Sequence, residues 1–317
     1  MNYLLIDNPV GEDKGFNVGD DIQVVAARRF YNSFKYINKY KLAYYNGEPS
    51  KIIMNGWFCH ADMAWPPSDD LIPKYISFHI NSAAEQRLLN ENGINYLKAH
   101  EPIGCRDVTT LAMLKKNNIS AYYSACITLT LQRSNFTQNK NRKGVVINDI
   151  SYKQTRYLHK NIIKFFLKGD FKRLRKYRKN NKLIKNFVLR SFDKNNISYT
   201  KHSLPLNFDN RDLRYKTAEN LLKQYADAEL VITSRIHCAL PCLALGTPVI
   251  FIDDSLSHTS ERSRLDGLID LFHIIRIEEN KLIIPEEITK LDSLKSLRNK
   301  STFEEFRDLI TSNLSNF

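Results

Sequence analysis

Short apolar runs alternate along the chain with segments in which apolar residues recur every three or four positions. The first run covers residues 3–7, and after a polar loop apolar side chains recur at Ile22, Val25, Ala26 and Phe30. Short runs indicate buried strands, and the three-to-four spacing indicates helices with one apolar face. Their alternation predicts an α/β protein with mainly parallel sheets.

The first half of the chain predicts one such series of elements. Strands are expected at residues 3–7, 51–56, 75–79, 121–124 and 128–131, and helices at 21–34, 83–92 and 107–116. We expect the second helix to end at Gly93, because glycine commonly follows the last turn of a helix.

Residues 132–143 are polar, show no apolar periodicity and predict a linker, after which a second series begins. Strands are expected at 144–149, near 199, and at 229–233, 248–252 and 274–277, and helices at 212–226, 236–245, 263–272 and 303–314. The chain is therefore predicted to form two Rossmann-like domains facing a cleft, residues 1–136 and 137–317. We expect the C-terminal helix to pack back on the first domain. Ligands of such sheets bind beyond the carboxyl ends of the strands.

The net charge of +13 is concentrated in one stretch of the chain. Residues 153–194 hold fifteen Lys and Arg residues against two acidic ones, so the remainder is neutral overall. We interpret residues 152–195 as a basic helical insertion. Its interspersed aromatic and aliphatic residues suit an anionic membrane surface or a solvated hairpin packed on its own domain, and the sequence leaves both open.

The amino-terminal residues run directly into an apolar strand without the basic and cleavage regions of a secretory signal. No apolar stretch approaches the roughly 18 residues of a membrane span, so we expect a cytoplasmic protein. The five cysteines form no Cys-x-x-Cys pair, and Cys238 and Cys242 lie in an apolar segment. Buried reduced thiols are expected, and no metal site.

The sharpest candidate site follows the strand at 229–233, where Ser234, Arg235 and His237 lead into an apolar helix. Ser234 is expected to cap that helix. An arginine and free backbone N–H groups at a helix start make an anion site, and Arg235 in an apolar frame needs a counter-anion. The alternatives are a surface ion pair for the arginine and a structural histidine.

Three further segments follow predicted strands. Asn17, Gly19 and Asp20 follow the first strand; Gly19 would let a ligand approach the backbone, and Asp20 suits a base or a helix-capping acid equally. Arg106 is a second candidate anion clamp, whereas the neighbouring Asp107 is expected to cap a helix. Trp57 suits either a stacking surface for a sugar ring or a core position.

Together these segments resemble the polysaccharide pyruvyl transferase family. The matching pieces, in family order, are Asn17-Val18-Gly19-Asp20 with Gln23, Asn55-Gly56-Trp57-Phe58, Glu101 through Asp107, Ser124 through Thr130, Ser234-Arg235-Ile236-His237 and Gly246-Thr247-Pro248. The basic segment matches no motif of the family.

The resemblance implies a fold similar to the two-domain (GT-B-like) glycosyltransferases, with an acceptor side over 1–136 and a donor side over 137–317. It implies transfer of the carboxyethylidene unit of phosphoenolpyruvate onto two hydroxyls of a sugar in a surface polysaccharide, capsule or exopolysaccharide, or in its lipid-linked precursor. The donor-binding residues of the family fall on Arg235 and His237. We assign His237 as acid or phosphate ligand, Asp20 as base, and Arg106, Ser234, Asn17, Gly19 and Trp57 to substrate binding, and expect no cofactor.

Two other classes of protein compete with this interpretation. A glycosyltransferase that uses nucleotide sugars would employ the same architecture, with Arg235 on a diphosphate. The basic segment suggests a nucleic-acid-binding protein, but its confinement to one stretch argues against that, and no nucleic-acid partner is expected. If the segment binds membrane, the enzyme is peripheral on the inner face of the plasma membrane.

Overall fold

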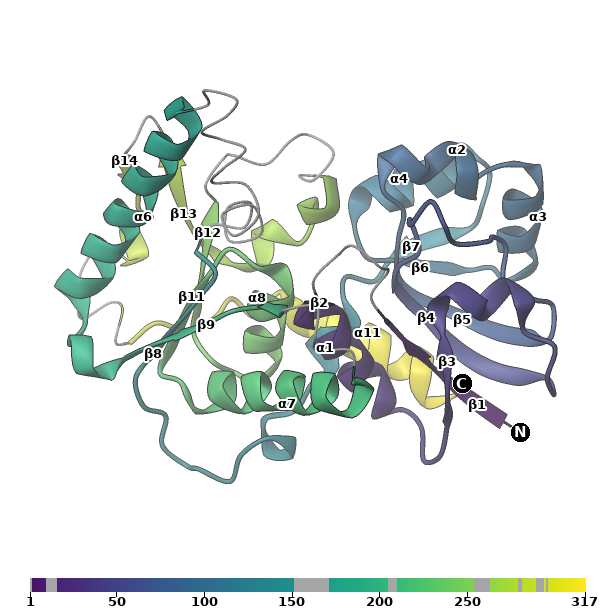
Figure 1. Ribbon diagram of the computed structural model, residues 1–317, viewed down its shortest axis with the longest axis horizontal. Helices are drawn as coiled ribbons and strands as arrows, with labels where there is room; N and C mark the ends of the chain where they lie inside the picture. Colours follow the sequence, from purple (N-terminus) through teal and green to yellow (C-terminus); the bar gives the residue numbers. More distant parts are fainter. Residues whose placement is uncertain are drawn as a thin grey trace.

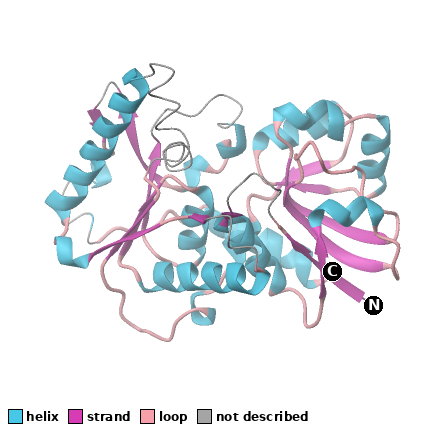
Figure 2. Ribbon diagram, in the orientation of Figure 1, coloured by secondary structure: helices cyan, strands magenta, loops and turns pink. Residues whose placement is uncertain are grey.

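The computed structural model describes residues 2–9, 16–150, 171–204, 210–253, 263–278, 281–288, 294 and 296–317. These residues form two α/β units, each built on a six-stranded, mainly parallel sheet (Figures 1 and 2). The prediction of two α/β units with parallel-rich sheets is confirmed. The cleft between them stays a prediction.

The first sheet has the order β3-β1-β4-β5-β6-β7, and all its neighbours pair in parallel. Its strands are β1 (Asn2–Asp7), β3 (Lys35–Asn38), β4 (Ser50–Trp57), β5 (Leu71–His79), β6 (Ile103–Cys105) and β7 (Ala121–Tyr123). The segments between them contain α1 (Val18–Arg28), η1 (Lys39–Tyr44), η2 (Ser82–Ala84), α2 (Glu85–Leu88), α3 (Glu91–Ala99) and α4 (Val108–Lys116).

The second sheet has the order β14-β13-β12-β11-β8-β9 and is parallel except for its edge strand β14. Its strands are β8 (Val145–Asn148), β9 (Ile197–Thr200), β11 (Leu230–Thr233), β12 (Val249–Asp253), β13 (His273–Glu278) and β14 (Lys281–Ile283). The helices are α6 (Phe171–Ser191), α7 (Arg211–Asp227), α8 (Ile236–Ala244) and α11 (Phe303–Ser315), with short turns η3 (Ile127–Thr130), η4 (Arg133–Asn135), η5 (Lys194–Asn196), η6 (Ser263–Leu265), η7 (Ile269–Leu271) and η8 (Glu286–Ile288).

Three expectations about single elements are wrong. The helix expected over 83–92 breaks at Leu89, and Gly93 lies inside α3, because Asn90 caps that helix and a Cβ at Gly93 would come within 2.1 Å of a backbone carbonyl. The strand expected at 128–131 is the turn η3, buried on all sides. The helix expected at 263–272 is replaced by η6 and η7.

The two sheets share one hydrophobic core. It contains Leu5 and Ile53 of the first sheet, Val146 and Val231 of the second, and α1 between them. Helix α1 follows the first strand, yet it packs mainly on α7 and η3. A two-stranded antiparallel ribbon, β2 (Phe16–Asn17) with β10 (Ser203–Leu204), also joins the start of α1 to the second unit.

A buried arginine holds α1 in this position. Arg214 of α7 is only 1% exposed, pairs with Asp7 at the end of β1, and lies 3.3 Å from Asp21 in the first turn of α1. Burial raises the pKa of Asp21 to about 7, against the lowering effect of Arg214. The guanidinium therefore compensates two carboxylates contributed by the other unit.

The C-terminal helix α11 lies against the first unit (Figure 1). Phe306 and Tyr123 of β7 pack edge to face with ring centroids 5.0 Å apart, and Lys51 of β4 donates to the carbonyl of Phe317 at 2.7 Å. The chain thus crosses from the first unit to the second near residues 132–143 and returns before residue 303.

The basic segment is described only from residue 171, so its part over 151–170 lies outside the described residues. In α6, Ile184 and Val188 are buried in a second-unit core with Ile147 and Leu230. Basic side chains on the opposite face are exposed, namely Arg175, Lys179, Lys182, Lys185 and Arg190. No helix in the described part of the chain is long and apolar enough to cross a membrane.

We expect Arg214→Met to destabilise the protein by about 3–5 kcal/mol, because the substitution leaves Asp21 buried without its counter-charge. The loss should shrink as the pH falls toward about 7 and below, since removal of Arg214 raises the pKa of Asp21 further and protonation of Asp21 removes the unpaired charge. Urea denaturation at pH 8 and pH 5.5 measures it. The double variant Arg214→Met/Asp21→Asn should regain much of the stability; equal losses in both variants would contradict the ion-pair account.

Candidate functional site

Chemistry-bearing residues gather where strands of the first sheet end. Trp57 ends β4, His79 ends β5, and Arg106 follows β6, the next strand in the sheet. The helix starts of α1 and α8 lie on the same side, because Gly19 of α1 packs against His237 of α8. The sequence-predicted residues Arg106, His237 and Asp20 are thus brought into one region.

Arg106 is a buried cation with spare hydrogen-bonding capacity. Its side chain is 2% exposed, and the nearest carboxylate, Asp107, lies 3.7 Å from its Nε. Within the described residues, its Nε and Nη2 atoms have no hydrogen-bond partner. A buried unpaired guanidinium nitrogen is costly, so these groups are suited to an incoming anion.

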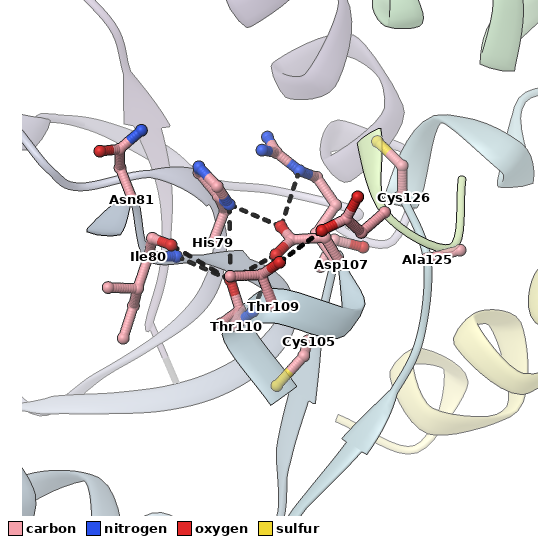
Figure 3. A network of polar contacts seen from close by, with 12 residues as sticks. His79, Ile80, Asn81, Cys105, Asp107, Thr109, Thr110, Ala125 and Cys126 are labelled. Carbon is pink, nitrogen blue, oxygen red and sulfur yellow. Dashed lines mark hydrogen bonds and ion pairs between the residues drawn. The ribbon is translucent and has the colours of Figure 1, made fainter. Parts of the chain in front are cut away.

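Asp107 caps α4, as predicted, and also binds a histidine that the sequence did not reveal (Figure 3). Its Oδ1 accepts hydrogen bonds from Thr110 N at 2.9 Å and Oγ1 at 2.8 Å, and its Oδ2 lies 2.5 Å from His79 Nδ1. Burial and the charge of Arg106 lower the pKa of His79 to about 4, against the raising effect of Asp107. His79 is therefore neutral near pH 7.

The counter-anion of Arg235 is Asp149, which follows β8. The Arg235 Nε donates to Asp149 Oδ2 at 3.2 Å, and Nη2 lies equally close to the same oxygen. The prediction that Ser234 caps α8 is wrong. Arg235 occupies the cap position, and the Ser234 hydroxyl donates to the carbonyl of Asp149. The backbone turn at Asp149, with φ +37°, makes both contacts possible. Substrate binding by Ser234 and Arg235 stays a prediction.

His237 lies in the first turn of α8, next to α1. A Cβ at Gly19 would stand 2.9 Å from His237 Nδ1, so the glycine makes room for the ring. Burial, together with the charge of Arg106, lowers the pKa of His237 well below its ordinary value. Its Nε2 is buried and has no hydrogen-bond partner among the residues that the structure describes.

Asp20 lines a small pocket, partly open to solvent, beside the first sheet. The other lining groups include Gln23, Lys39, Asn55 and Trp57. Burial raises the pKa of Asp20, although Lys39 and Arg106 oppose the rise. The capping alternative for Asp20 is wrong, because Asn17 caps α1 through its side chain. The pocket lining therefore combines an aromatic side chain, a carboxylate with a raised pKa and an amide. These groups are suited to contact a polyhydroxylated ring.

Sequence reasoning missed Asp149, His79, Lys39 and Arg264. Asp149 could have been found from the sequence, since it ends the predicted strand at 144–149. In the sheet this strand is the neighbour of the one that leads to Arg235. Lys39 is 5% exposed, and burial lowers its pKa. Arg264 of η6 adds positive charge to the site, because its charge lowers the pKa of Asp20, His79 and His237.

The described residues contain no group of three or more His, Cys, Asp or Glu side chains arranged to hold a metal ion. All five cysteines are free thiols, and four of them are buried.

The chain matches the family model described as polysaccharide pyruvyl transferase over residues 17–255. No curated protein matches it. Among solved structures it is similar to a functionally uncharacterised protein from Klebsiella pneumoniae subsp. pneumoniae, with 13% identity and a TM-score of 0.47 over 90% of this chain and 93% of that chain. It is also similar to UDP-GlcNAc 2-epimerase from Methanocaldococcus jannaschii, with 9% identity and a TM-score of 0.36 over 93% and 98%.

We expect the protein to lose stability as the pH falls from about 6.5 toward 4. In that range the unfolded chain protonates His79, whereas the folded chain, in which its pKa is about 4, does not. Each such histidine contributes a loss of up to about 1.4 kcal/mol per pH unit. The loss should be smaller in His79→Asn, as measured by urea denaturation at pH 7 and pH 5. A His79 ring that titrates near 6.5 by NMR would refute this account.

Proposed function

Because the chain belongs to the polysaccharide pyruvyl transferase family, we propose that it transfers the carboxyethylidene unit of phosphoenolpyruvate onto two hydroxyls of one sugar. The products are a pyruvate ketal and inorganic phosphate. The observation that carries the proposal is the buried guanidinium of Arg106, whose Nε and Nη2 have no hydrogen-bond partner within the described residues. Phosphoenolpyruvate offers a carboxylate and a phosphate, the groups that bind guanidinium best.

The donor is proposed to bind between Arg106 and His237. Arg106 is close enough to His237 to lower its pKa, and Arg264 adds to the same positive field. Neutral His237 would donate one hydrogen bond to the donor phosphate, and the phosphate charge would raise the pKa of the ring. His237 then acts as phosphate ligand before catalysis and as an acid once the donor is bound. Arg235, already paired with Asp149, would hold the start of α8 and reach the donor carboxylate.

The acceptor sugar is proposed to bind over the mouth of the small pocket lined by Asp20, Trp57 and Asn55. Trp57 would stack on the sugar ring, and Asn55 would bind a hydroxyl. Since burial raises the pKa of Asp20, this carboxylate is a better proton acceptor than an exposed one, which supports its assignment as a base. Contacts from Asn17 and Gly19 would lie at the edge of the site, beside the start of α1. The reaction as proposed assigns no role to a metal or a resident cofactor.

We further propose that the acceptor is lipid-linked and that α6 holds the enzyme on the anionic inner face of the plasma membrane. The exposed basic face of α6 supports this, whereas Ile184 and Val188 on its other face are committed to the protein core. Attraction would therefore come from charge, at about 1 kcal/mol for each basic residue near the surface.

Arg106→Gln should weaken binding of phosphoenolpyruvate and slow turnover on the order of a hundredfold or more, because the anion loses its buried charge partner. Calorimetry with phosphoenolpyruvate and phosphate release with a panel of acceptor glycosides measure the two effects. Arg276→Gln, which removes an exposed charge on β13, is the matched control and should behave like the wild type. The proposal fails if the wild type releases no phosphate from phosphoenolpyruvate but transfers sugar from nucleotide sugars.

Reversing Lys179, Lys182 and Lys185 to Glu should abolish co-sedimentation with vesicles containing anionic lipid. Removing three favourable charges alone costs about 3 kcal/mol, or roughly a hundredfold in binding. Activity on a soluble acceptor should persist, because these side chains lie on the exposed face of α6. Failure of the wild type to bind anionic vesicles at low salt would reject membrane association while leaving the transferase proposal intact.

A further inference from the structure

His79, a neutral histidine beside the site, has one ring nitrogen in a hydrogen bond and the other without a hydrogen-bond partner among the described residues. His79 Nδ1 lies 2.5 Å from Asp107 Oδ2, and both side chains are completely buried. Since the ionised carboxylate only accepts, Nδ1 carries the proton and Nε2 presents a lone pair. In the described part of the chain, His79 Nε2 has no hydrogen-bond partner. Leaving a buried acceptor unsatisfied costs about 1–3 kcal/mol, which points to a ligand group that completes it.

Asp107 is held firmly in the orientation that this tautomer requires. Its second oxygen accepts two hydrogen bonds from Thr110, the third residue of α4, and the carboxylate caps that helix (Figure 3). The His79 ring therefore cannot turn without losing its bond to a fixed carboxylate. This arrangement fixes the direction of Nε2.

His79 lies close to groups assigned to the acceptor and to groups assigned to the donor. Its ring centroid lies 5.1 Å from that of Trp57, which lines the acceptor pocket. Arg106 is near enough for its charge to lower the pKa of His79, and His79 in turn is near enough to lower that of His237. A proton acceptor at this position adjoins both reactants.

A purely structural clamp between β5 and α4 would need only the Nδ1 contact. Such a clamp explains the bond to Asp107 but gives no reason to bury Nε2 without a hydrogen-bond partner in the region where Nε and Nη2 of Arg106 also lack one. A serine, threonine or asparagine would join the two elements at lower cost.

We propose that His79, oriented by Asp107, is a catalytic proton carrier that takes the proton of one acceptor hydroxyl and delivers it to the methylene carbon of the donor. This inference rests on the proposed function. As the hydroxyl oxygen bonds to C2, its proton passes to Nε2. The electron pair of the C2–C3 double bond takes up that proton at C3, which becomes the methyl group.

The second half of the reaction completes the balance. The bond from C2 to the phosphate oxygen breaks with its electron pair on phosphate, and the second hydroxyl bonds to C2. Its proton passes to Asp20, and His237, the acid assigned at the donor phosphate, supplies the departing phosphate with a proton that Asp20 then restores. Two hydroxyl protons thus end on the methyl group and on phosphate, so no external acid, base or oxidant is required.

The charges around His79 suit this role. Arg106 and Arg264 favour the neutral ring of His79, and Asp107 favours the protonated one. His237 is itself neutral and adds no charge. Binding of an anionic donor at Arg106 would offset the positive charge and raise the pKa of His79. The ring would then become a stronger base only when the donor is present.

The test compares His79→Asn with His100→Asn, using phosphoenolpyruvate and an acceptor glycoside. In both variants the new amide stands where ring Nδ1 made a hydrogen bond, to Asp107 and to the carbonyl of Tyr96 respectively, while Nε2 is lost. We expect His79→Asn to lower kcat about 10²–10⁴-fold, with donor affinity changed less than threefold, and His100→Asn to retain wild-type kcat. Asp107→Asn, which keeps a good helix cap, should lower kcat and shift the pH–rate profile.

The outcomes separate the two proposals. Wild-type turnover of phosphoenolpyruvate together with normal kcat and an unshifted pH profile in His79→Asn and Asp107→Asn would overturn the proton-carrier role alone. A kcat loss in a smaller His79→Ala variant that added imidazole restores would support it, because a structural clamp gains nothing from a free base. A wild type that does not use phosphoenolpyruvate would instead overturn the proposed function.

Discussion

The position of α1 governs the rest of this structure, and one buried guanidinium secures it. Arg214 of the second unit compensates Asp7 and Asp21, which the first unit contributes at the end of β1 and the start of α1. With α1 fixed there, Gly19 comes against His237, and Asp20 faces the pocket beside Trp57. Groups that are more than 200 residues apart in sequence are thereby set in one site.

Much of the fold could be predicted from apolar patterning, because most strands are short apolar runs with turns on either side. The pattern failed where burial was not periodic. Residues 127–131 alternate apolar and threonine side chains like a strand, but all are buried, since η3 is enclosed by α1, α8 and α11. The prediction that Gly93 ends a helix failed for a different reason. This glycine lies inside α3, where it permits a close backbone contact.

The candidate site was predictable only in part. Arg106, Asp20 and His237 were found because each lies at a strand end or a helix start, where local sequence marks the position. Asp149 and His79 depend on pairing between neighbouring parallel strands, so their partners are 86 and 28 residues distant. A single sequence carries no direct record of such pairings. Because Arg235 is already paired with Asp149, Arg106 is the better candidate to bind an anion, since its Nε and Nη2 lack hydrogen-bond partners within the described chain.

The shared core has a mechanical consequence. Two-domain proteins commonly open and close about a hinge when the contact between their domains is small and polar. Here the chain crosses between the units twice, a β-ribbon joins them, and α1 and α11 lie in a continuous apolar interior. Rigid-body opening would expose that interior to water and would therefore cost free energy. Under the proposed function, we expect ligands to enter and leave through movements of side chains and loops at the strand ends rather than through opening of the two units.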